Sequence, residues 1–336
     1  MLLIYLLFIL LLCLWRIRIS TDGDYLSKER CNSIKGVFIL MIFLTHSLQY
    51  IEASGYVLSG MDTITQTIIS FTGQLVVVMF LFYSGYGVGV QVNKKGEQYV
   101  KQMPRRRVLN TLINFDVAVC FFIILDLLLS RPLSISQALL SFVAWDSVGN
   151  SNWYIFVILL CYIFTYFANI ISSRYAGEVI LVICLGAMLL LSYTKGTWWY
   201  DTIMTYPAGY YYAKYRNLLE LLFKRYYFPI LLVLFAVFVF THGHGPYLRG
   251  LRPNIMAVAF ALIVVMLSMK ICVENSWLQW LGSNLFPLYI YQRIPMIALP
   301  VVIGDVMFKY PITNLICCVL ITCLIATNYK YWRIIN

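Results

Sequence analysis

Charged residues are scarce in this 336-residue chain: 12% are Asp, Glu, Lys or Arg, whereas 61% are hydrophobic. The mean hydropathy is +0.80. No long polar stretch is present from which a separate soluble domain could form. A soluble globular fold cannot bury this much apolar surface, so that class is excluded. The composition predicts an all-α, polytopic transmembrane helical bundle.

Residue patterns typical of metal sites and disulfide frameworks are also missing. The nine cysteines fall mostly inside apolar segments and lack metal-ligand spacing to the three histidines. His242 and His244 lie in one loop without nearby carboxylate or thiol partners. We therefore expect no metal and no disulfide framework, and interpret the cysteines as small core residues.

The apolar runs predict about eleven membrane spans. They cover residues 1–17, 33–51, 74–92, 109–129, 153–171, 177–193, 198–213, 227–241, 254–272, 283–303 and 313–330. With the N-terminus outside and the C-terminus inside, 19 of the 25 Lys and Arg residues fall on the cytoplasmic side and five outside. This bias is how membrane proteins set their orientation. It also explains the net charge of +11 without a nucleic-acid partner.

The first span has the length of a signal-peptide core but lacks its other features. MLLIYLLFILLLCLW has no positive segment before it and no small-residue cleavage site, and Arg16 and Arg18 follow it. We expect residues 1–17 to be an additional, uncleaved N-terminal anchor. Residues 18–336 would then form the main membrane domain.

His46 is the strongest candidate for chemistry, because an imidazole within an apolar span is costly to keep there. Lys35 precedes it by eleven residues, almost three helical turns. Both side chains therefore share one helix face, about 16 Å apart along the axis. Such a pair could hold the two ends of an elongated, anionic, reactive ligand. Structural packing and a proton relay are the alternative roles for His46.

A second basic cluster, Arg105, Arg106 and Arg107, lies in the predicted cytoplasmic loop 93–108. Arginine binds phosphate groups in a bidentate manner. Anchoring to anionic membrane lipid is the simpler interpretation. If this cluster and Lys35 border one funnel leading to His46, the funnel would suit coenzyme A, whose thioester lies at the end of an extended arm. Neutral His46 could then be a general base or carry the acyl group itself.

Other polar or aromatic residues inside the spans are candidates for a substrate or structural site. Arg293 is about ten residues into its span and needs a partner. Asp116 matches it in depth, so we expect an Arg293–Asp116 pair that is either structural or catalytic. Two prolines bracket this span and could direct Tyr289 and Gln292 toward a cavity. The remaining candidates are Ser84, Tyr86, Trp153 and Tyr154.

Five motifs, in order over residues 30–300, resemble the integral-membrane acyltransferase 3 family. RCNSIKGVFILMIFLTHS is similar to its first helix, with a basic residue eleven positions before a histidine. FLFYSGYGVG, PRRRVLN, SNWYIFVILLCYI and LGSNLFPLYIYQRIP follow as further family-like motifs. Two positions depart from the pattern: Lys35 stands where many members have Arg, and Gln292 stands where the last motif often has His.

The resemblance implies an enzyme that moves an acyl group, usually acetyl, from cytoplasmic acyl-CoA to a hydroxyl on an extracytoplasmic glycan. Residues 18–336 would be the membrane acyltransferase domain, with ten family-like helices, in the bacterial inner membrane. His46 would be catalytic, and Lys35, Arg105, Arg106 and Arg107 would bind acetyl-CoA. The acceptor would be an O-antigen, capsule or exopolysaccharide, free or lipid-linked. The alternative is a transporter or flippase with His46 as proton relay; a polysaccharide polymerase is disfavoured because the predicted outer loops are short.

Overall fold

The computed structural model describes residues 2–19, 23–58, 60–242, 248–304 and 306–334. His244 lies outside the described residues. So do residues 1 and 336, at which the first expected domain begins and the second ends.

Helices make up nearly all of the described structure, and one short antiparallel ribbon joins β1 to β2. In chain order the elements are α1 (Leu2–Leu14), β1 (Ile17–Ile19), α2 (Lys28–Ala53), α3 (Met61–Thr72), α4 (Leu75–Lys95), α5 (Glu97–Met103), a π-helix (Pro104–Leu109), α6 (Asn110–Leu128), α7 (Ile135–Ser141), α8 (Trp153–Ile171), α9 (Ala176–Thr194), a 3₁₀ turn (Thr197–Trp199), α10 (Thr205–Lys214), α11 (Arg216–Arg225), α12 (Tyr227–His242), a 3₁₀ turn (Leu248–Gly250), α13 (Leu251–Ser268), β2 (Ile271–Val273), α14 (Ser276–Ser283), α15 (Leu285–Tyr291), α16 (Arg293–Ile303), α17 (Val306–Lys309), α18 (Pro311–Asn328) and a 3₁₀ turn (Tyr329–Tyr331).

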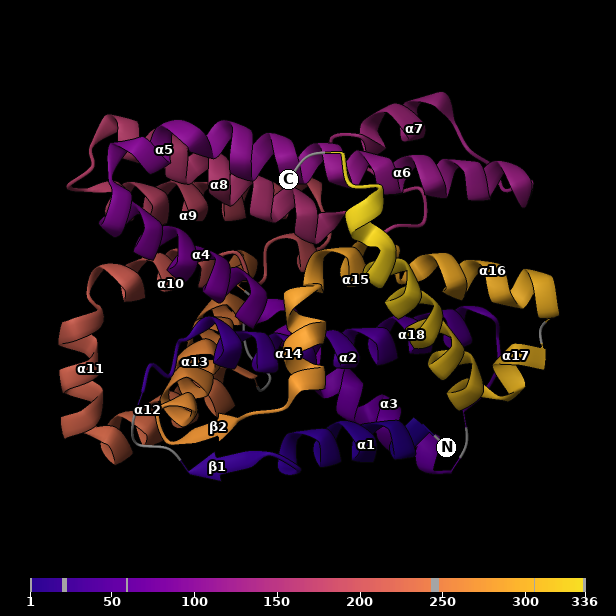
Figure 1. The fold of residues 1–336 in the computed structure, drawn as a ribbon, viewed down its shortest axis with the longest axis horizontal. Coiled ribbons are helices and arrows are strands. Elements are labelled where there is room, and N and C mark those ends of the chain that lie inside the picture. The colour runs from indigo at the N-terminus through magenta and orange to yellow at the C-terminus, as the bar shows by residue number, and fades with distance from the viewer. Residues whose placement is uncertain (1, 20–22, 59, 243–247, 305, 335–336) are drawn as a thin grey trace.

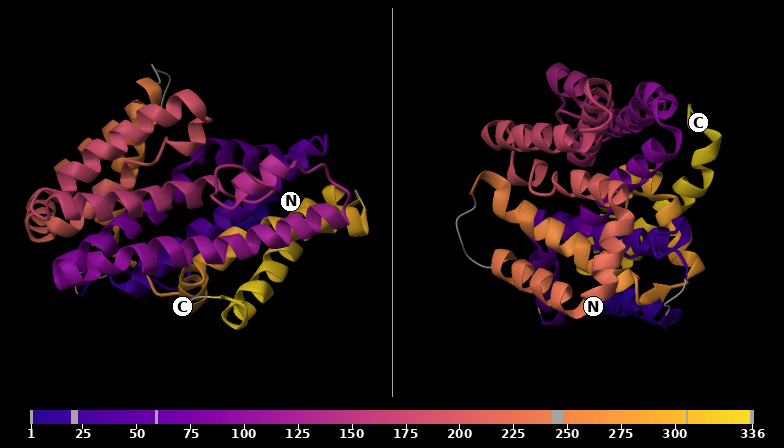
Figure 2. Two further views of the ribbon diagram at one scale, coloured as in Figure 1. Left: turned by 90° about the horizontal axis from the view of Figure 1, so that it is seen from above. Right: turned by 90° about the vertical axis from the view of Figure 1, so that its left-hand side faces the viewer.

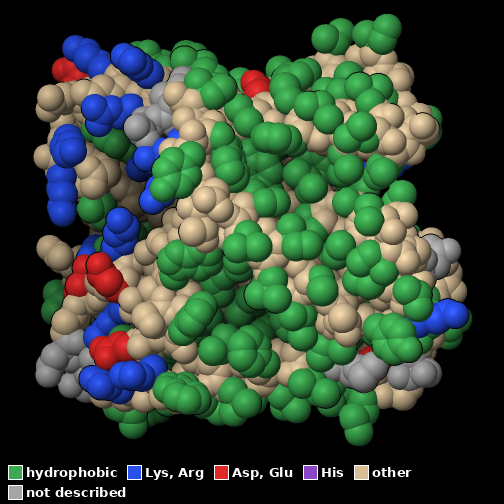
Figure 3. All heavy atoms as spheres, turned by 45° about the vertical axis from the view of Figure 1, so that its right-hand side comes forward, with side chains coloured by type: hydrophobic (Ala, Val, Ile, Leu, Met, Phe, Trp, Pro, Cys, Tyr) green, Lys and Arg blue, Asp and Glu red, His purple; other side chains and the backbone are tan. Residues whose placement is uncertain are grey.

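The long helices α2, α6, α8 and α16 run in a broadly common direction, horizontal in Figure 1, and Figure 2 shows the same bundle from two other sides. On the face drawn in Figure 3, Lys and Arg gather at the left-hand edge, while apolar side chains cover most of the remaining surface. That edge corresponds to the end of the bundle where α5 and α11 lie in Figure 1. The molecule therefore has one basic end and a mainly apolar flank.

Eight helical segments in the described residues are long and apolar enough to cross a membrane, or nine if a bent pair counts as one span. The chain is thus a multi-pass helical membrane protein, as the composition predicts. Three of the eleven expected spans, residues 1–17, 198–213 and 227–241, are not single helices of membrane length. Helix α1 has only 13 residues. Residues 198–213 form a 3₁₀ turn and the ten-residue α10, and α12 is bent by 100° from α11.

Glycines allow two pairs of helices to cross in unusually close contact. A Cβ on Gly85 of α4 would collide with the Tyr206 carbonyl of α10, and one on Gly209 of α10 would collide with the Phe82 carbonyl of α4. A similar pair joins α2 to α14: Gly36 lies against the Leu278 carbonyl, and Gly282 faces α2 in return. Backbone contact of this kind requires small residues, as is usual between helices in a membrane. These crossings set the positions of α2 and α4, which carry the candidate site.

Candidate active site

Helices α2 and α4 border two cavities, one toward each end of the bundle. The basic cavity, of about 1440 Å³, is lined by α2 residues around Lys35, by α4 beyond Tyr83, and by the π-helix and the α10–α11 junction. The histidine cavity, of about 630 Å³, is lined by α2 residues around His46 and by the first turn of α4. Lys35 and His46, singled out by their spacing, therefore lie in different cavities on the same helix.

Cations dominate the lining of the basic cavity, to which the described residues contribute a single carboxylate. The charged lining residues are Lys28, Lys35, Lys94, Lys95, Arg106, Arg107, Lys214, Arg216 and Asp24. Within the described part of the chain, only two of these cations form ion pairs: Lys214 with Glu178, and Arg216 with Asp24 and Glu220. The other six leave the cavity with a large positive charge, which suits a ligand with several phosphate groups.

The three arginines of the predicted cluster are not equivalent. They lie on the π-helix that joins α5 to α6. Arg107 donates to the Tyr99 hydroxyl through Nε at 3.1 Å, and its guanidinium lies 5.9 Å from the centre of the Tyr162 ring. Arg106 also lines the basic cavity, whereas Arg105 is exposed and is not among its lining residues. The structure thus brings Lys35, Arg106 and Arg107 to one cavity and places Arg105 outside its wall.

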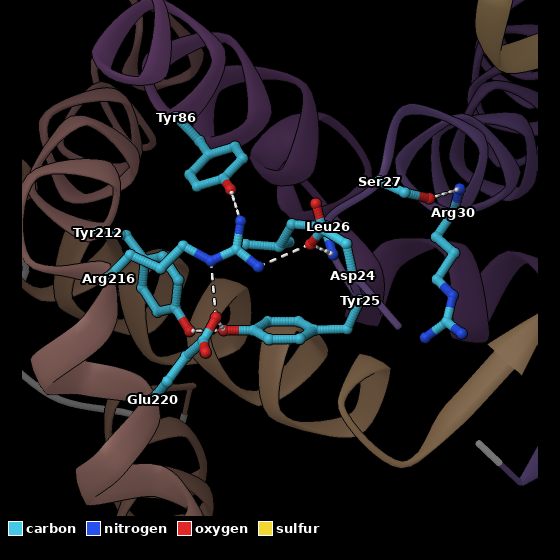
Figure 4. Close-up of polar contacts among 9 residues, drawn as sticks. All are labelled: Asp24, Tyr25, Leu26, Ser27, Arg30, Tyr86, Tyr212, Arg216 and Glu220. Atoms are coloured by element: carbon cyan, nitrogen blue, oxygen red, sulfur yellow. Dashed lines mark hydrogen bonds and ion pairs between the residues drawn. The ribbon is translucent and has the colours of Figure 1, made fainter. Parts of the chain in front are cut away.

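Arg216 is a residue of this cavity that the sequence interpretation missed. It donates to the Glu220 carboxylate through Nε, to the Tyr86 hydroxyl through Nη1 and to the Asp24 carboxylate through Nη2, each at 2.6 Å (Figure 4). Tyr25 closes the cluster by hydrogen bonding to Glu220. Glu220 is four residues from Arg216 on α11, but only the tertiary fold brings Asp24 and Tyr86 to it, from 192 and 130 residues away.

The Arg216 cluster also gives the predicted residue Tyr86 a structural role, since its hydroxyl accepts from Arg216. Burial disfavours ionisation of Asp24, but hydrogen bonds from Arg216 and the Leu26 amide outweigh it and hold the pKa of Asp24 below its usual value. Asp24 therefore stays ionised at neutral pH. The cluster ties the segment before α2 to α4 and to the α10–α11 junction.

His46 is almost fully buried in α2, with 7% of its surface exposed, and lines the histidine cavity. Gln292, fully buried at the α15–α16 junction, lies beside the imidazole. Buried polar atoms without a hydrogen-bond partner among the described residues surround this cavity: His46 Nδ1, Gln74 Oε1, Asn150 Nδ2, Ser151 Oγ, Tyr289 Oη and Arg293 Nε. Unsatisfied buried polar groups are few in folded proteins. Their concentration here leaves hydrogen-bonding capacity for water or a polar ligand in the histidine cavity.

The expected ion pair between Arg293 and Asp116 is wrong. Arg293 instead donates to the Gln49 side chain through Nη2 at 3.0 Å, and its guanidinium lies 5.8 Å from the centre of the Tyr50 ring. Asp116 Oδ1 has no hydrogen-bond partner among the described residues. Equal depth along two spans predicted the pair, but depth does not fix which face of each helix carries the side chain. Arg293 faces α2 and the histidine cavity.

Three other predicted residues, Ser84, Tyr154 and Tyr289, belong to a series of contacts that links residues lining the two cavities. Tyr154 packs edge-on against Tyr289, with ring centres 5.2 Å apart, and Tyr289 lines the histidine cavity. Ser84 lies beside Tyr154 and Tyr162, and Tyr162 is the ring next to Arg107 of the basic cavity. The expected single funnel is therefore two cavities with a wall of hydroxyl-bearing side chains between them. Trp153, the predicted neighbour of Tyr154, lines the histidine cavity.

A cation held between indole rings at the histidine cavity was also missed by the sequence interpretation. Lys195 Nζ lies 3.7 Å from the ring centre of Trp145 and 4.3 Å from that of Trp199. It donates to the Trp145 carbonyl at 2.7 Å. Burial lowers the pKa of Lys195, and the nearby Asp146 opposes that shift. The tryptophans are visible in the sequence, but their meeting with Lys195 depends on how two loops fold back over α8.

The described residues contain no group of three His, Cys, Asp or Glu side chains able to hold a metal ion.

Comparison with known proteins gave one result. Residues 30–328 match the model of a family described as an acyltransferase domain, Acyl_transf_3. No curated protein and no solved structure gave a significant match. The matched segment covers most of the chain, so the protein belongs to the acyltransferase 3 family of membrane acyltransferases.

Proposed function

We propose that this protein transfers an acetyl group from cytoplasmic acetyl-CoA to a hydroxyl of an extracytoplasmic glycan, free or lipid-linked. In this proposal the basic end faces the cytoplasm of a bacterium and the histidine cavity faces the outer side of its inner membrane. The bias of 19 basic residues to one side supports that orientation. It requires an odd number of crossings. Eleven remains our proposal, counting the eight long apolar segments, the shorter α1 and α10, and the bent α11–α12 pair.

The basic cavity is the proposed donor site. Coenzyme A carries a diphosphate and a further phosphate, and six lining cations lack an ion-pair partner among the described residues. Arg106 and Arg107 would bind phosphates in a bidentate manner, and Lys35 would act as a point charge. Gly87 contributes open space to this wall, because a Cβ there would meet nothing within 4 Å.

The acetyl end of the donor would extend past Ser84 and Tyr154 toward His46. About three turns of α2 separate Lys35 from His46, close to the reach of an extended pantetheine arm. The wall between the cavities consists of side chains. Tyr154 and Phe80 are among them, and their ring centres are 6.1 Å apart. In this proposal, rotation of these side chains admits the thioester arm.

The proposed chemistry is acyl transfer with His46 as general base. The imidazole accepts the proton of the acceptor hydroxyl while that oxygen attacks the thioester carbonyl. Arg293, close enough to interact electrostatically with the ring, would stabilise the oxyanion that forms on the carbonyl oxygen. The C–S bond then breaks, the acetyl ester is released, and the proton passes from His46 to the departing thiolate. In a two-step variant, an imidazole nitrogen attacks the thioester first and carries the acetyl group to the hydroxyl.

The observation that carries this proposal is that one helix, α2, presents Lys35 to a polycationic cavity and His46 to a second cavity surrounded by unsatisfied polar atoms. A donor with phosphates at one end and a reactive carbonyl at the other matches both ends. The family match supports the reaction class.

The test uses the full chain in proteoliposomes, with labelled acetyl-CoA on one side and glycan on the other. We expect wild-type protein to form acetylated glycan, detected by mass spectrometry. His46→Ala should lower the rate by at least 100-fold, within the usual contribution of a general base, while acetyl-CoA binding persists. His242→Ala is the matched control, because that imidazole stacks on Phe71 and lines neither cavity. Normal acetylation by His46→Ala would refute the catalytic role, and solute movement without acetyl transfer would favour a transporter.

A further inference from the structure

Lys195 immediately follows α9 and places an ammonium group at the wall of the histidine cavity. Indole faces rather than a carboxylate hold it there, through the two cation–π contacts with Trp145 and Trp199. An ammonium has three N–H donors, and the Trp145 carbonyl accepts one of them. Lys195 forms no ion pair with any described residue. The charge is thus fixed in position while most of its hydrogen-bonding capacity remains available.

Arg293 is a second cation on the same wall and is likewise bound by a neutral group, the Gln49 amide. Among the described residues, Asp146 is the one carboxylate that lines this cavity. Its Oδ1 accepts from the Ser147 amide at 2.8 Å, and it interacts with Lys195 only beyond ion-pair distance. The cavity therefore holds two cations against one carboxylate. Cations that are partly or fully removed from water are costly unless an anion accompanies them.

We infer that the acceptor bound in the histidine cavity carries an anionic group, a carboxylate or a phosphate, and that Lys195 binds that group; this rests on the proposed function. The indoles of Trp145 and Trp199 make Lys195 a specificity residue. They hold its stem in one place, and they attract the ammonium without neutralising it. An acidic sugar would fit both features, because its ring can lie against the tryptophans lining the cavity while its acidic group reaches the ammonium.

The test measures binding of model acceptors to the full chain in nanodiscs that carry the His46→Ala substitution, so that no turnover occurs. The probes are a uronic-acid glycoside, its methyl ester and a sugar phosphate, each followed by quenching of tryptophan fluorescence. We expect the uronate or the phosphate, or both, to bind at least about tenfold more tightly than the neutral ester, the gain from one charge-assisted hydrogen bond. The anion that binds more tightly shows whether the anionic group of the acceptor is a carboxylate or a phosphate.

Two variants separate recognition of charge from support of the fold. Lys195→Met keeps an unbranched stem between the indoles and should reduce the preference for the anion to less than threefold. Lys195→Arg keeps the charge and should restore the preference. The preference should also fall as salt is raised, because the charge is partly exposed.

Equal binding of the ester and the anions, or no saturable binding of any of them, would overturn the inference. An anion preference that persists in Lys195→Met would overturn the role of Lys195. These results are distinguishable from failure of the proposed function. Acetylation of neutral glycans without preference would leave the enzyme assignment intact, whereas Lys195-dependent binding of anions without any acetyl transfer would not.

Discussion

Replacing one glycine of α4 should show how tightly the donor cavity depends on a single helix crossing. Gly85 packs against the backbone carbonyl of Tyr206 in α10, and a Cβ at that position would lie well inside van der Waals contact with it. Four residues along, a Cβ on Gly89 would lie 2.7 Å from the Ala213 Cβ. Ordinary carbon–carbon contacts are about 3.5–4.0 Å, so even the milder of the two sites lacks roughly 1 Å of space.

The expected cost of Gly85→Ala follows from these contacts. Overpacking of a close interface costs up to about 3 kcal/mol, and alanine regains about 1 kcal/mol of helix propensity. The net destabilisation should therefore be about 2 kcal/mol, because a backbone carbonyl cannot rotate away as a side chain could. Gly87→Ala is the matched control on the same helix. It meets nothing within 4 Å and should be neutral or slightly stabilising.

Thermal unfolding of the two detergent-solubilised variants, followed by size-exclusion chromatography after heating, measures the difference. Gly85→Ala should lower the apparent Tm by several degrees and weaken acetyl-CoA binding, because α10 leads into the Arg216 junction of the basic cavity. Gly87→Ala, the control for stability, should not lower the apparent Tm. Equal stability of both variants and the wild type would refute the close α4–α10 crossing.

Two further predictions concern the basic cavity. Arg107→Gln should weaken acetyl-CoA binding by about tenfold or more, the value of a charged hydrogen bond. Arg105→Gln should change the affinity by less than about twofold, because Arg105 does not line the cavity. Calorimetry of both variants measures the two affinities, and equal losses would contradict the prediction. Arg216→Met should destabilise the protein by about 1–2 kcal/mol at neutral pH, a value reduced for the partial exposure of the cluster. Because the pKa of Asp24 is lowered in the folded state, its contribution is present above about pH 4 and is lost as pH falls through the folded pKa. The difference in apparent Tm between wild type and Arg216→Met should therefore be smaller at pH 3 than at pH 7. The same difference at both pH values would contradict this account.

The sequence determined the class of fold and its reaction family because both depend on local patterns. Apolar runs of membrane length predicted a multi-pass helical bundle. Five ordered motifs predicted the acyltransferase 3 family, which the match over residues 30–328 confirms. The eleven-residue spacing placed Lys35 and His46 on one helix, and α2 covers both. Helical periodicity and hydropathy carry this information along the chain, so no knowledge of neighbouring helices is needed.

Only the tertiary structure decided which side chains meet. Equal depth in two spans predicted an ion pair between Arg293 and Asp116. The rotation of each helix about its axis instead turns Arg293 toward Gln49, to which it donates a hydrogen bond. Asp24 and Tyr86 reach Arg216, and Trp145 reaches Lys195, from segments far apart in the sequence, and no local periodicity encodes such a meeting. The same limit applies to Gly85 and Gly87, which are indistinguishable as sequence: packing against α10 makes one a helix contact and leaves the other facing the basic cavity.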